Sequence, residues 1–291
     1  MQTMIGVIGG SGLYQIDGLE GASWVKVKSP WGKPSDEVLV GRLQGVPIAF
    51  LPRHGRGHGI APTEINARAN IDALKRLGCT DLIAVSAVGS LRQDFRPGDV
   101  VIVDQVIDRT FARPKSFFGT GCVAHVGFAQ PVCERLSHQC QDAAAATGAR
   151  VHLGATYLAM EGPQFSTLAE SRLYRSWGAD VIGMTAMPEA KLAREAELCY
   201  ALVGLVTDYD CWHPAEGAVD VAQVVATLAA NAGTARALIA GLPGRLAAAA
   251  RAPCPQGCDH ALDGALMTAP AQRDPDLLAK LDAVAGRLLK G

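Results

Sequence analysis

The sequence predicts an α/β protein with a single domain, built on a central mixed, largely parallel β-sheet that helices flank. Two observations support this fold class. Short β-branched runs bounded by Gly, Asp and Pro recur along the chain, and helical patterns separate several of them. The predicted strands are Met4–Ile8, Pro47–Leu51, Leu82–Val88, Val100–Val106, Val181–Met184 and Tyr200–Val206.

Three segments between or after these strands have helical patterns. One begins near Pro62 and ends at Gly78, with apolar residues at helical spacing. Another begins with Pro188, which is tolerated in a first turn because its missing N–H has no partner there. The third covers about Val221 to Leu242.

The composition changes after the third helix. The segment AAAARAPCPQG, residues 247–257, is typical of a linker. We therefore divide the chain into a catalytic domain, residues 1–246, and a tail of linker and helix, residues 247–291. The tail contains one short amphipathic helical pattern, with apolar residues at Leu277, Leu278, Leu281, Val284 and Leu288. We expect this tail to pack on the core or on a neighbouring subunit.

The charge balance argues against several classes of partner. The 291 residues include 27 Lys and Arg against 28 Asp and Glu, for a formal net charge of -1. Nucleic-acid binders concentrate basic residues, and no such stripe is present. No apolar run reaches the roughly 18 residues of a membrane span, and the N-terminus begins with a strand-like segment rather than a signal peptide. We expect a cytoplasmic protein that binds neither nucleic acid nor membranes.

Eight cysteines are too dilute for a disulfide scaffold, and six of them stand singly among apolar or helical residues. Cys254 and Cys258 form a C-x3-C pair, for which a metal site, a disulfide and two idle thiols all remain open. Because no second Cys or His pair stands at zinc-finger spacing, the sequence assigns no metal site.

Three donor-rich segments lie at the ends of predicted strands. Gly9, Gly10, Ser11 and Gly12 offer backbone N–H groups and a hydroxyl, although they match neither the dinucleotide nor the P-loop pattern. The segment PRHGRGHG, residues 52–59, brings four basic or imidazole side chains together, and SAVGS, residues 86–90, adds hydroxyls. Taken singly, these segments are equally typical of a tight turn, a solvated loop and a helix cap. Together they predict one oxyanion pocket, with phosphate or sulfate favoured over carboxylate.

An acidic pair follows the last predicted strand. If strand geometry persists, Asp208 and Asp210 point to the same side and converge on one ligand. A carboxyl group whose pKa is raised by burial and by a neighbouring charge can act as a general acid. A helix-capping or calcium-like turn is the alternative, but too few oxygen ligands surround the pair for a calcium loop.

In this order, the segments resemble the trimeric nucleoside phosphorylases, and among them the 5′-methylthioadenosine phosphorylases. The matching strings are IGVIGGSGLY, PRHGRGH, SAVGSLR, EGPQFST, GMTAMPEAKLAREAELCYA and TDYDCW. The resemblance implies phosphorolysis of a purine nucleoside, with inorganic phosphate as co-substrate and no metal or organic cofactor. It also implies a homotrimer, or a hexamer of two trimers, with sites at subunit boundaries.

The resemblance implies roles for individual residues. Phosphate would be held by Ser11, Arg53, His54, Ser86, Ala87 and Thr185. Met184 would lie under the ribose, Phe165 would stack on the purine and Ser166 would lie beside it. His58 and Val224 would line the 5′ pocket, and His125 would come from an adjacent subunit; a loop histidine is the alternative for His125.

Asp208 would deliver a proton to N7 of the base and Asp210 would accept from its 6-amino group, although the two assignments are interchangeable. Ser166 and Asp208 match the adenine-cleaving type, since relatives acting on 6-oxopurines have Glu and Asn there. Two departures from the family pattern, Gly183 in place of Asn and Met187 after an alanine, resemble bacterial methylthioinosine-cleaving relatives. A methylthioinosine or 6-oxopurine nucleoside phosphorylase is therefore the alternative activity.

Overall fold

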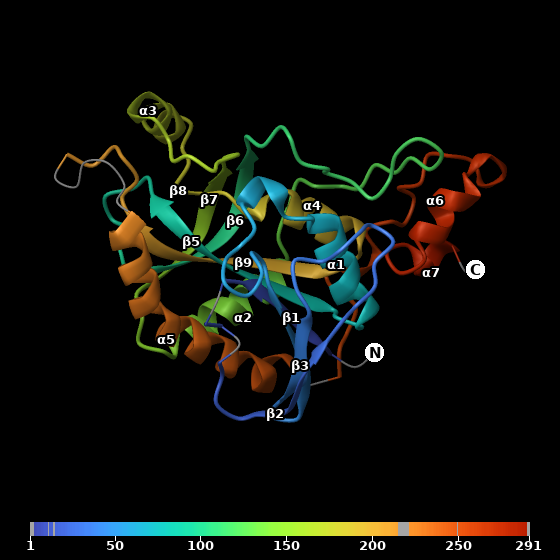
Figure 1. The fold of residues 1–291 in the computed structure, drawn as a ribbon, viewed down its shortest axis with the longest axis horizontal. Coiled ribbons are helices and arrows are strands. Elements are labelled where there is room, and N and C mark those ends of the chain that lie inside the picture. Colours follow the sequence, from blue (N-terminus) through green and yellow to red (C-terminus); the bar gives the residue numbers. More distant parts are fainter. Residues whose placement is uncertain (1–2, 11, 14, 215–220, 249, 290–291) are drawn as a thin grey trace.

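The fold is a mixed nine-stranded sheet with helices on both faces, seen in a computed structural model that describes residues 3–10, 12–13, 15–214, 221–248 and 250–289 (Figure 1). The strand order is β2-β3-β4-β1-β5-β8-β7-β6-β9, and β5 also pairs with β9. The strands are β1 (Ile5–Gly9), β2 (Leu19–Val25), β3 (Val38–Leu43), β4 (Val46–Pro52), β5 (Asp81–Ser90), β6 (Val100–Asp108), β7 (Val151–Ala159), β8 (Val181–Gly183) and β9 (Cys199–Asp208). This architecture confirms the predicted fold class.

The extra β5–β9 pairing closes five strands, β5, β8, β7, β6 and β9, into a ring. Strands β1, β4, β5 and β9 run parallel, so that their carboxyl ends meet at one edge. Ligands of open α/β sheets bind at such an edge. At the other end of the sheet, β2 pairs only with β3, and a register shift between Glu20 and Ser23 interrupts that pairing.

Two helices cover each face of the sheet. On one face, α1 (Ala67–Arg76) and α4 (Ala186–Glu195) share an apolar core with alternate residues of β5 and β9. On the other face, α2 (Glu134–Ala145) and α5 (Val221–Leu246) pack on the intervening residues of the same strands (Figure 1). Because successive strand residues point to opposite faces, a continuous apolar run supplies both cores.

The predicted strands all exist, but three further strands were not predicted. These are β2, β3 and β7. The predicted first helix begins later than expected, because Pro62–Glu64 forms a 3-10 turn and the Asn66 side chain caps the α-helix proper. Helix α4 confirms the prediction at Pro188, since Met187 before it has non-helical backbone angles. Helices α2 and α3 (Leu168–Ser176) were also not predicted.

The tail folds as short elements beside the core. After the 3-10 turns Cys258–His260 and Pro270–Gln272 come α6 (Pro275–Lys280) and α7 (Gly286–Leu289). The single amphipathic helix expected here is wrong, because the chain between Leu281 and Ala285 leaves the helical path. Leu281 and Val284 are nevertheless buried in the same core as α1 and α4.

Helix α5 is apolar over most of its length. Residues Val224–Leu246 are long and apolar enough to cross a membrane by length and composition alone. In the fold this helix packs along α2 and β9, and Leu238, Ile239 and Leu242 are fully buried there. Burial against the sheet accounts for only part of this apolar composition, because 22% of the most apolar stretch is buried in the part of the chain that the structure describes.

Candidate active site

The candidate site lies where the carboxyl ends of the parallel strands meet. Arg53 and His54 directly follow β4, Ser86 lies in β5, and Asp208 is the last residue of β9. Thr185 follows β8, which pairs with the end of β5 through Gly89 and Ser90. The topology therefore brings together side chains that are far apart in the sequence.

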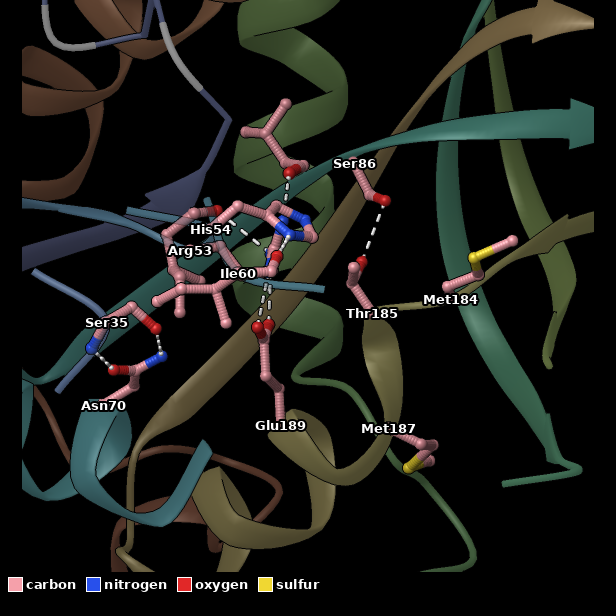
Figure 2. A network of polar contacts seen from close by, with 12 residues as sticks. Ser35, Arg53, His54, Ile60, Asn70, Ser86, Met184, Thr185, Met187 and Glu189 are labelled. Atoms are coloured by element: carbon pink, nitrogen blue, oxygen red, sulfur yellow. Dashed lines mark hydrogen bonds and ion pairs between the residues drawn. The ribbon is translucent and has the colours of Figure 1, made fainter. Parts of the chain in front are cut away.

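Arg53 is buried and bound to the protein itself. Its Nε lies 2.5 Å and its Nη2 lies 3.1 Å from the two carboxylate oxygens of Glu189 in α4 (Figure 2). Its Nη1 and Nη2 also donate to the carbonyl oxygens of Val85 and Ile8. Burial lowers the pKa of Arg53, but the charge of Glu189 outweighs this and raises it above its usual value. The sequence predicted that the Arg53 guanidinium binds an anionic ligand. In the structure Glu189 occupies two of its N–H groups instead, because a buried guanidinium needs a counter-charge.

His54 is a neutral imidazole, and its Nε2 has no hydrogen-bond partner among the residues that the structure describes. Its Nδ1 lies 2.8 Å from the carbonyl oxygen of Ile60, which can only accept, so that Nδ1 carries the proton. Burial, with the charges of Arg53 and His58, lowers the pKa of His54 to about 4. The His58 ring stacks on it with centroids 4.3 Å apart. Nε2 of His54 is thus an acceptor, suited to the hydroxyl of a protonated phosphate.

Two hydroxyl groups, one from β5 and one from the residue that precedes α4, meet beside this histidine. The Ser86 Oγ and Thr185 Oγ1 atoms are 2.9 Å apart, and both side chains are buried (Figure 2). Ser86 also donates to the carbonyl of half-buried Ala87. The N–H of Thr185 donates to the Tyr157 hydroxyl. Paired hydroxyls at a strand edge offer the donors that an oxyanion needs.

The acidic pair is close together for a reason other than strand alternation. Strand β9 ends at Asp208, and Asp210 lies in a turn with a φ of 51°. Asp208 Oδ1 accepts from the Asp210 N–H at 2.7 Å, and Oδ2 accepts from the Thr207 hydroxyl at 2.7 Å. An Asp side chain that bonds to the backbone two residues later favours such a turn. The predicted convergence is therefore present, but a turn makes it.

The two carboxyl groups have different surroundings. Burial raises the pKa of Asp210 to about 6, and the charge of Asp208 adds to the shift. The nearby Ser171 hydroxyl offsets part of this shift, but the buried Oδ2 atom of Asp210 makes no close hydrogen bond among the described residues. Both oxygens of Asp208 accept hydrogen bonds. The environment therefore favours Asp210 as the proton carrier, which is the exchanged form of the assignment preferred from the sequence.

Gly89 forms the floor beneath the acidic pair. It pairs with Ile182 of β8 and with Asp208 of β9. A Cβ atom at this position would lie 2.9 Å from Asp208 Oδ1 and 3.1 Å from the Ile182 side chain. Only glycine lets the three strands meet this closely.

The predicted base-binding loop contacts both the acidic turn and Met184. The Cys211 thiol lies 3.4 Å from the carbonyl oxygen of Ser166, and the Ser166 hydroxyl lies 3.8 Å from the Met160 sulfur. Phe165 is 44% exposed at the tip of this loop. At Gly162, a Cβ atom would lie 2.5 Å from the Met184 sulfur, so that Met184 packs directly on the loop. These contacts place the expected ribose and base residues beside the acid pair.

The structure does not bring every predicted residue into this cluster. Ser11 lies outside the described residues. His58 is exposed, and Val224 is half-buried in the first turn of α5. His125 is exposed on a loop whose backbone N–H donates to Ala265 of the tail. No described contact joins His125 or Val224 to the other site residues.

A groove opens on one side of His54. It has a volume of about 840 Å³ and is lined by both acidic and basic side chains. Lys26, Lys28, Lys33 and Arg56 contribute positive charge, and Asp36 pairs with Arg56 at its wall. The groove makes the His54 side of the site accessible and electropositive.

Two buried ion pairs in the site were not predicted. One is Arg53 with Glu189, and the other is Arg113 with Glu161, joined at 3.0 Å. Arg113 also donates to the carbonyls of Met184 and Met187, so that it ties the base loop to the segment carrying Thr185. No local pattern identifies such pairs, because their members are 136 and 48 residues apart.

Comparisons with known proteins identify the family of the chain. The model of the Phosphorylase superfamily matches residues 4–243. An S-methyl-5′-thioadenosine phosphorylase of Cereibacter sphaeroides is 70% identical over 291 residues and covers 100% of both chains. Another from Bradyrhizobium diazoefficiens is 56% identical, covering 100% of this chain and 99% of its own.

Solved structures show the same relationship. The crystal structure of a methylthioadenosine phosphorylase from an antarctic soil metagenomic library has a TM-score of 0.90 and 45% identity, covering 97% of this chain and 99% of its own. An adenosine/methylthioadenosine phosphorylase of Schistosoma mansoni, solved as a mutant with adenine, has a TM-score of 0.86 and 34% identity, covering 91% of this chain and 99% of its own. The chain therefore belongs to the phosphorylase superfamily, in its S-methyl-5′-thioadenosine phosphorylase family.

Proposed function

We propose that the protein cleaves 5′-deoxy-5′-methylthioadenosine with inorganic phosphate, which gives adenine and 5-methylthioribose 1-phosphate. The observation that carries this proposal is the buried Asp208–Asp210 pair at the same sheet edge as the Ser86–Thr185 hydroxyls and His54. An anion site and an acid site at one edge of the sheet suit phosphorolysis of a glycosidic bond, in which phosphate adds to the ribose and a proton is delivered to the leaving base. The full-length relatives named for this reaction support it.

The phosphate is held by the hydroxyl and imidazole cluster. When phosphate binds, Ser86 and Thr185 give up their mutual hydrogen bond and the bond of Ser86 to Ala87, and donate to the phosphate oxygens instead. The Ala87 backbone lies beside the phosphate, and Nε2 of neutral His54 accepts from its hydroxyl. Arg53 contributes a remaining Nη1 hydrogen, while its bond to Glu189 fixes the strand end that carries His54. Ser11 belongs to this set by resemblance. The bound anion then attacks C1′ and stabilises positive charge that develops on the ribose.

The leaving purine is neutralised from the opposite side. Asp210, whose raised pKa keeps part of it protonated near neutral pH, delivers a proton to N7, and Asp208 accepts from the 6-amino group. Phe165 stacks on the base, Ser166 lies at its edge and Met184 contacts the ribose. A 6-oxo oxygen facing an acceptor carboxylate would cost about 1–3 kcal/mol as an unpaired buried contact. The protein therefore prefers 6-aminopurines.

The site is completed in a homo-oligomer, a trimer or a hexamer of two trimers. His58 and Val224 line the 5′ pocket, and the exposed position of His125 suits a residue that reaches an adjacent subunit. The reaction itself uses phosphate as co-substrate and no metal or organic cofactor. We place this reaction in the cytoplasm, where phosphate and nucleosides are available.

The direct test measures phosphate-dependent release of free base from methylthioadenosine, methylthioinosine, adenosine and inosine. Adenine release from methylthioadenosine, abolished when phosphate is omitted, is the expected result. A hundredfold preference for methylthioinosine or inosine would contradict the assignment of Ser166 and Asp208. It would leave the phosphate site intact and favour the alternative oxopurine activity.

A further inference from the structure

Four buried cysteines converge far from the candidate active site. Cys133 precedes α2, Cys199 begins β9, and Cys254 and Cys258 lie in the tail. Their four sulfur atoms all lie within 4.8 Å of one another. The side chains are at most 6% exposed. The C-x3-C pair of the sequence is therefore half of a set of four.

The spacing of the sulfur atoms suits a tetrahedral metal ion. A zinc–sulfur bond is about 2.3 Å long, which places the sulfurs of a zinc tetrathiolate about 3.8 Å apart. The Cys133 and Cys254 sulfurs are 3.6 Å apart. A disulfide requires about 2.05 Å between its two sulfurs, so this contact is near metal-ligand spacing and well outside bonding distance.

The charges around the cluster also suit thiolates. Arg194 Nη1 lies 3.5 Å from the Cys258 sulfur, and Arg251 Nη2 lies 3.4 Å from the Cys199 sulfur. Both guanidinium groups are almost fully buried. A neutral thiol is a weak acceptor that gives a buried cation little compensation. Four thiolates around Zn²⁺ have a net charge of −2. Arg194, Arg251 and Arg135 supply three positive charges beside the cluster, and Asp81, which pairs with Arg251 and Arg135 opposite Cys199, removes one of them, so the charges balance.

We propose that Cys133, Cys199, Cys254 and Cys258 form a structural zinc site. The set has four sulfur ligands and is buried, as in closed structural sites that keep no position for a substrate. Asp81 fixes Arg251 by an ion pair beside the cluster. This proposal revises the expectation from the sequence that the chain holds no metal, because only folding brings the third and fourth ligands to the C-x3-C pair.

The position of the site indicates its role. Two ligands belong to the catalytic domain and two to the tail, so the metal fastens the tail to the sheet. Cys199 lies at the opposite end of β9 from Asp208, and ten strand residues span roughly 30 Å. The zinc site therefore stabilises the fold and takes no part in the reaction, and it does not depend on the proposed function.

The first experiment measures metal by inductively coupled plasma mass spectrometry on full-length protein purified without chelators. One zinc per chain is expected in the wild type. Cys254→Ser and Cys258→Ser are expected to lose it, whereas Cys140→Ala, which removes a buried cysteine outside the set, is expected to keep it. Cobalt exchanged into the wild type should give the intense visible bands of a tetrahedral tetrathiolate centre.

A second pair of measurements remains informative if the serine variants fail to fold. Ellman's reagent should find all eight thiols in denatured, chelator-treated wild type that has seen no reductant. In native protein, a strong chelator should speed protease cleavage within residues 247–253. Fewer than eight thiols would show a disulfide and overturn the proposal. Eight thiols without bound metal would show idle cysteines, and would overturn it as well.

Discussion

Asp210 has both an unusual backbone conformation and a carboxyl group whose pKa is raised. Its φ of 51° lies in the left-handed region that non-glycine residues rarely adopt. The hydrogen bond from its N–H to Asp208 maintains that turn, and the turn buries a carboxyl oxygen whose nearest hydroxyl, that of Ser171, makes no close hydrogen bond to it. Backbone strain of this kind is typical of functional sites. The hydrogen bond between Asp208 and the Asp210 N–H therefore supports both the left-handed turn and the burial that raises the pKa of Asp210.

The pH dependence of the reaction should therefore report Asp210. Because burial raises its pKa to about 6 and the protonated form is the active one, kcat/KM should be level below that pH. Above it, kcat/KM should fall about tenfold per pH unit, because this alkaline limb of the profile follows the fraction of free enzyme in which Asp210 is protonated. Rates at fixed phosphate across pH 5–9 measure the profile.

Asp210→Asn should lower turnover at least ~10²-fold and remove this limb. A 7-deaza substrate, which lacks the N7 acceptor, should react slowly in both proteins and show no difference between them. If Asp208→Asn removed the limb and Asp210→Asn retained it, the proton carrier would be Asp208 instead.

The Arg53–Glu189 pair should contribute stability as a unit. Glu189→Gln leaves a buried guanidinium without its counter-charge, and we expect the free energy of unfolding to fall by about 3 kcal/mol. Replacing both residues by apolar ones, as Arg53→Met with Glu189→Leu, should restore most of this loss. Denaturant unfolding of the three variants tests this, and an unaffected single variant would show that the pair is dispensable.

At the scale of elements, β8 explains a departure from the family pattern. Gly183 ends this strand, and a Cβ atom there would lie 2.1 Å from the Tyr157 hydroxyl of β7. That hydroxyl also accepts from the Thr185 N–H. The tyrosine occupies the space that a larger residue at 183 would need, so that Gly183 is a packing requirement in this chain.

Gly183→Ala should therefore destabilise the protein by about 1–3 kcal/mol through overpacking. Adding Tyr157→Ala should make the double variant more stable than the sum of the two single effects, since the clash disappears. Gly127→Ala, where a new Cβ meets nothing within 4 Å, serves as the control. Additive effects in the double variant would show that the contact is unimportant.

The strands that the sequence predicted are more deeply buried than strands β2 and β7, which it missed. Long apolar runs identified the central strands, because a strand covered on both faces has little polar character. Strand β2 is mostly exposed and β7 is only half-buried at its start, and neither forms such a run. Helix α3 did have a signal, the capping box of Thr167 and Glu170, which was not used.

The site shows the same limit. Sequence motifs identified His54, Ser86, Asp208 and Asp210 because each lies in or directly after the carboxyl half of a strand. The topology of the sheet then brings such residues together. Glu189 and Arg113 are buried partners chosen by tertiary packing, and no local pattern marks them. In the four-cysteine cluster, the sequence likewise indicated only the neighbouring pair Cys254 and Cys258, because Cys133 and Cys199 reach it through tertiary packing.

At the scale of the whole molecule, the role proposed for His125 predicts sites that are shared between chains. Inactive His125→Ala and Asp210→Ala chains, mixed by co-expression, should recover activity, because some sites then take Asp210 from one chain and His125 from the other. Each variant expressed alone provides the control. Recovery should require assembly, which size-exclusion chromatography with light scattering monitors. Failure to recover activity would place His125 in its own chain's function or in none.

The ring of five strands has a consequence for association between molecules. Each strand of the ring pairs on both sides, although residues 151–156 of β7 lie before its short pairing with β8, so this half of the sheet offers little template for sheet extension. In the part of the chain that the structure describes, β2 is the strand that pairs with a single neighbour. Its register shift and the charged Glu20 blunt its other side. Misassembly through added strands would therefore begin at β2, where a substitution that straightens the strand would promote aggregation.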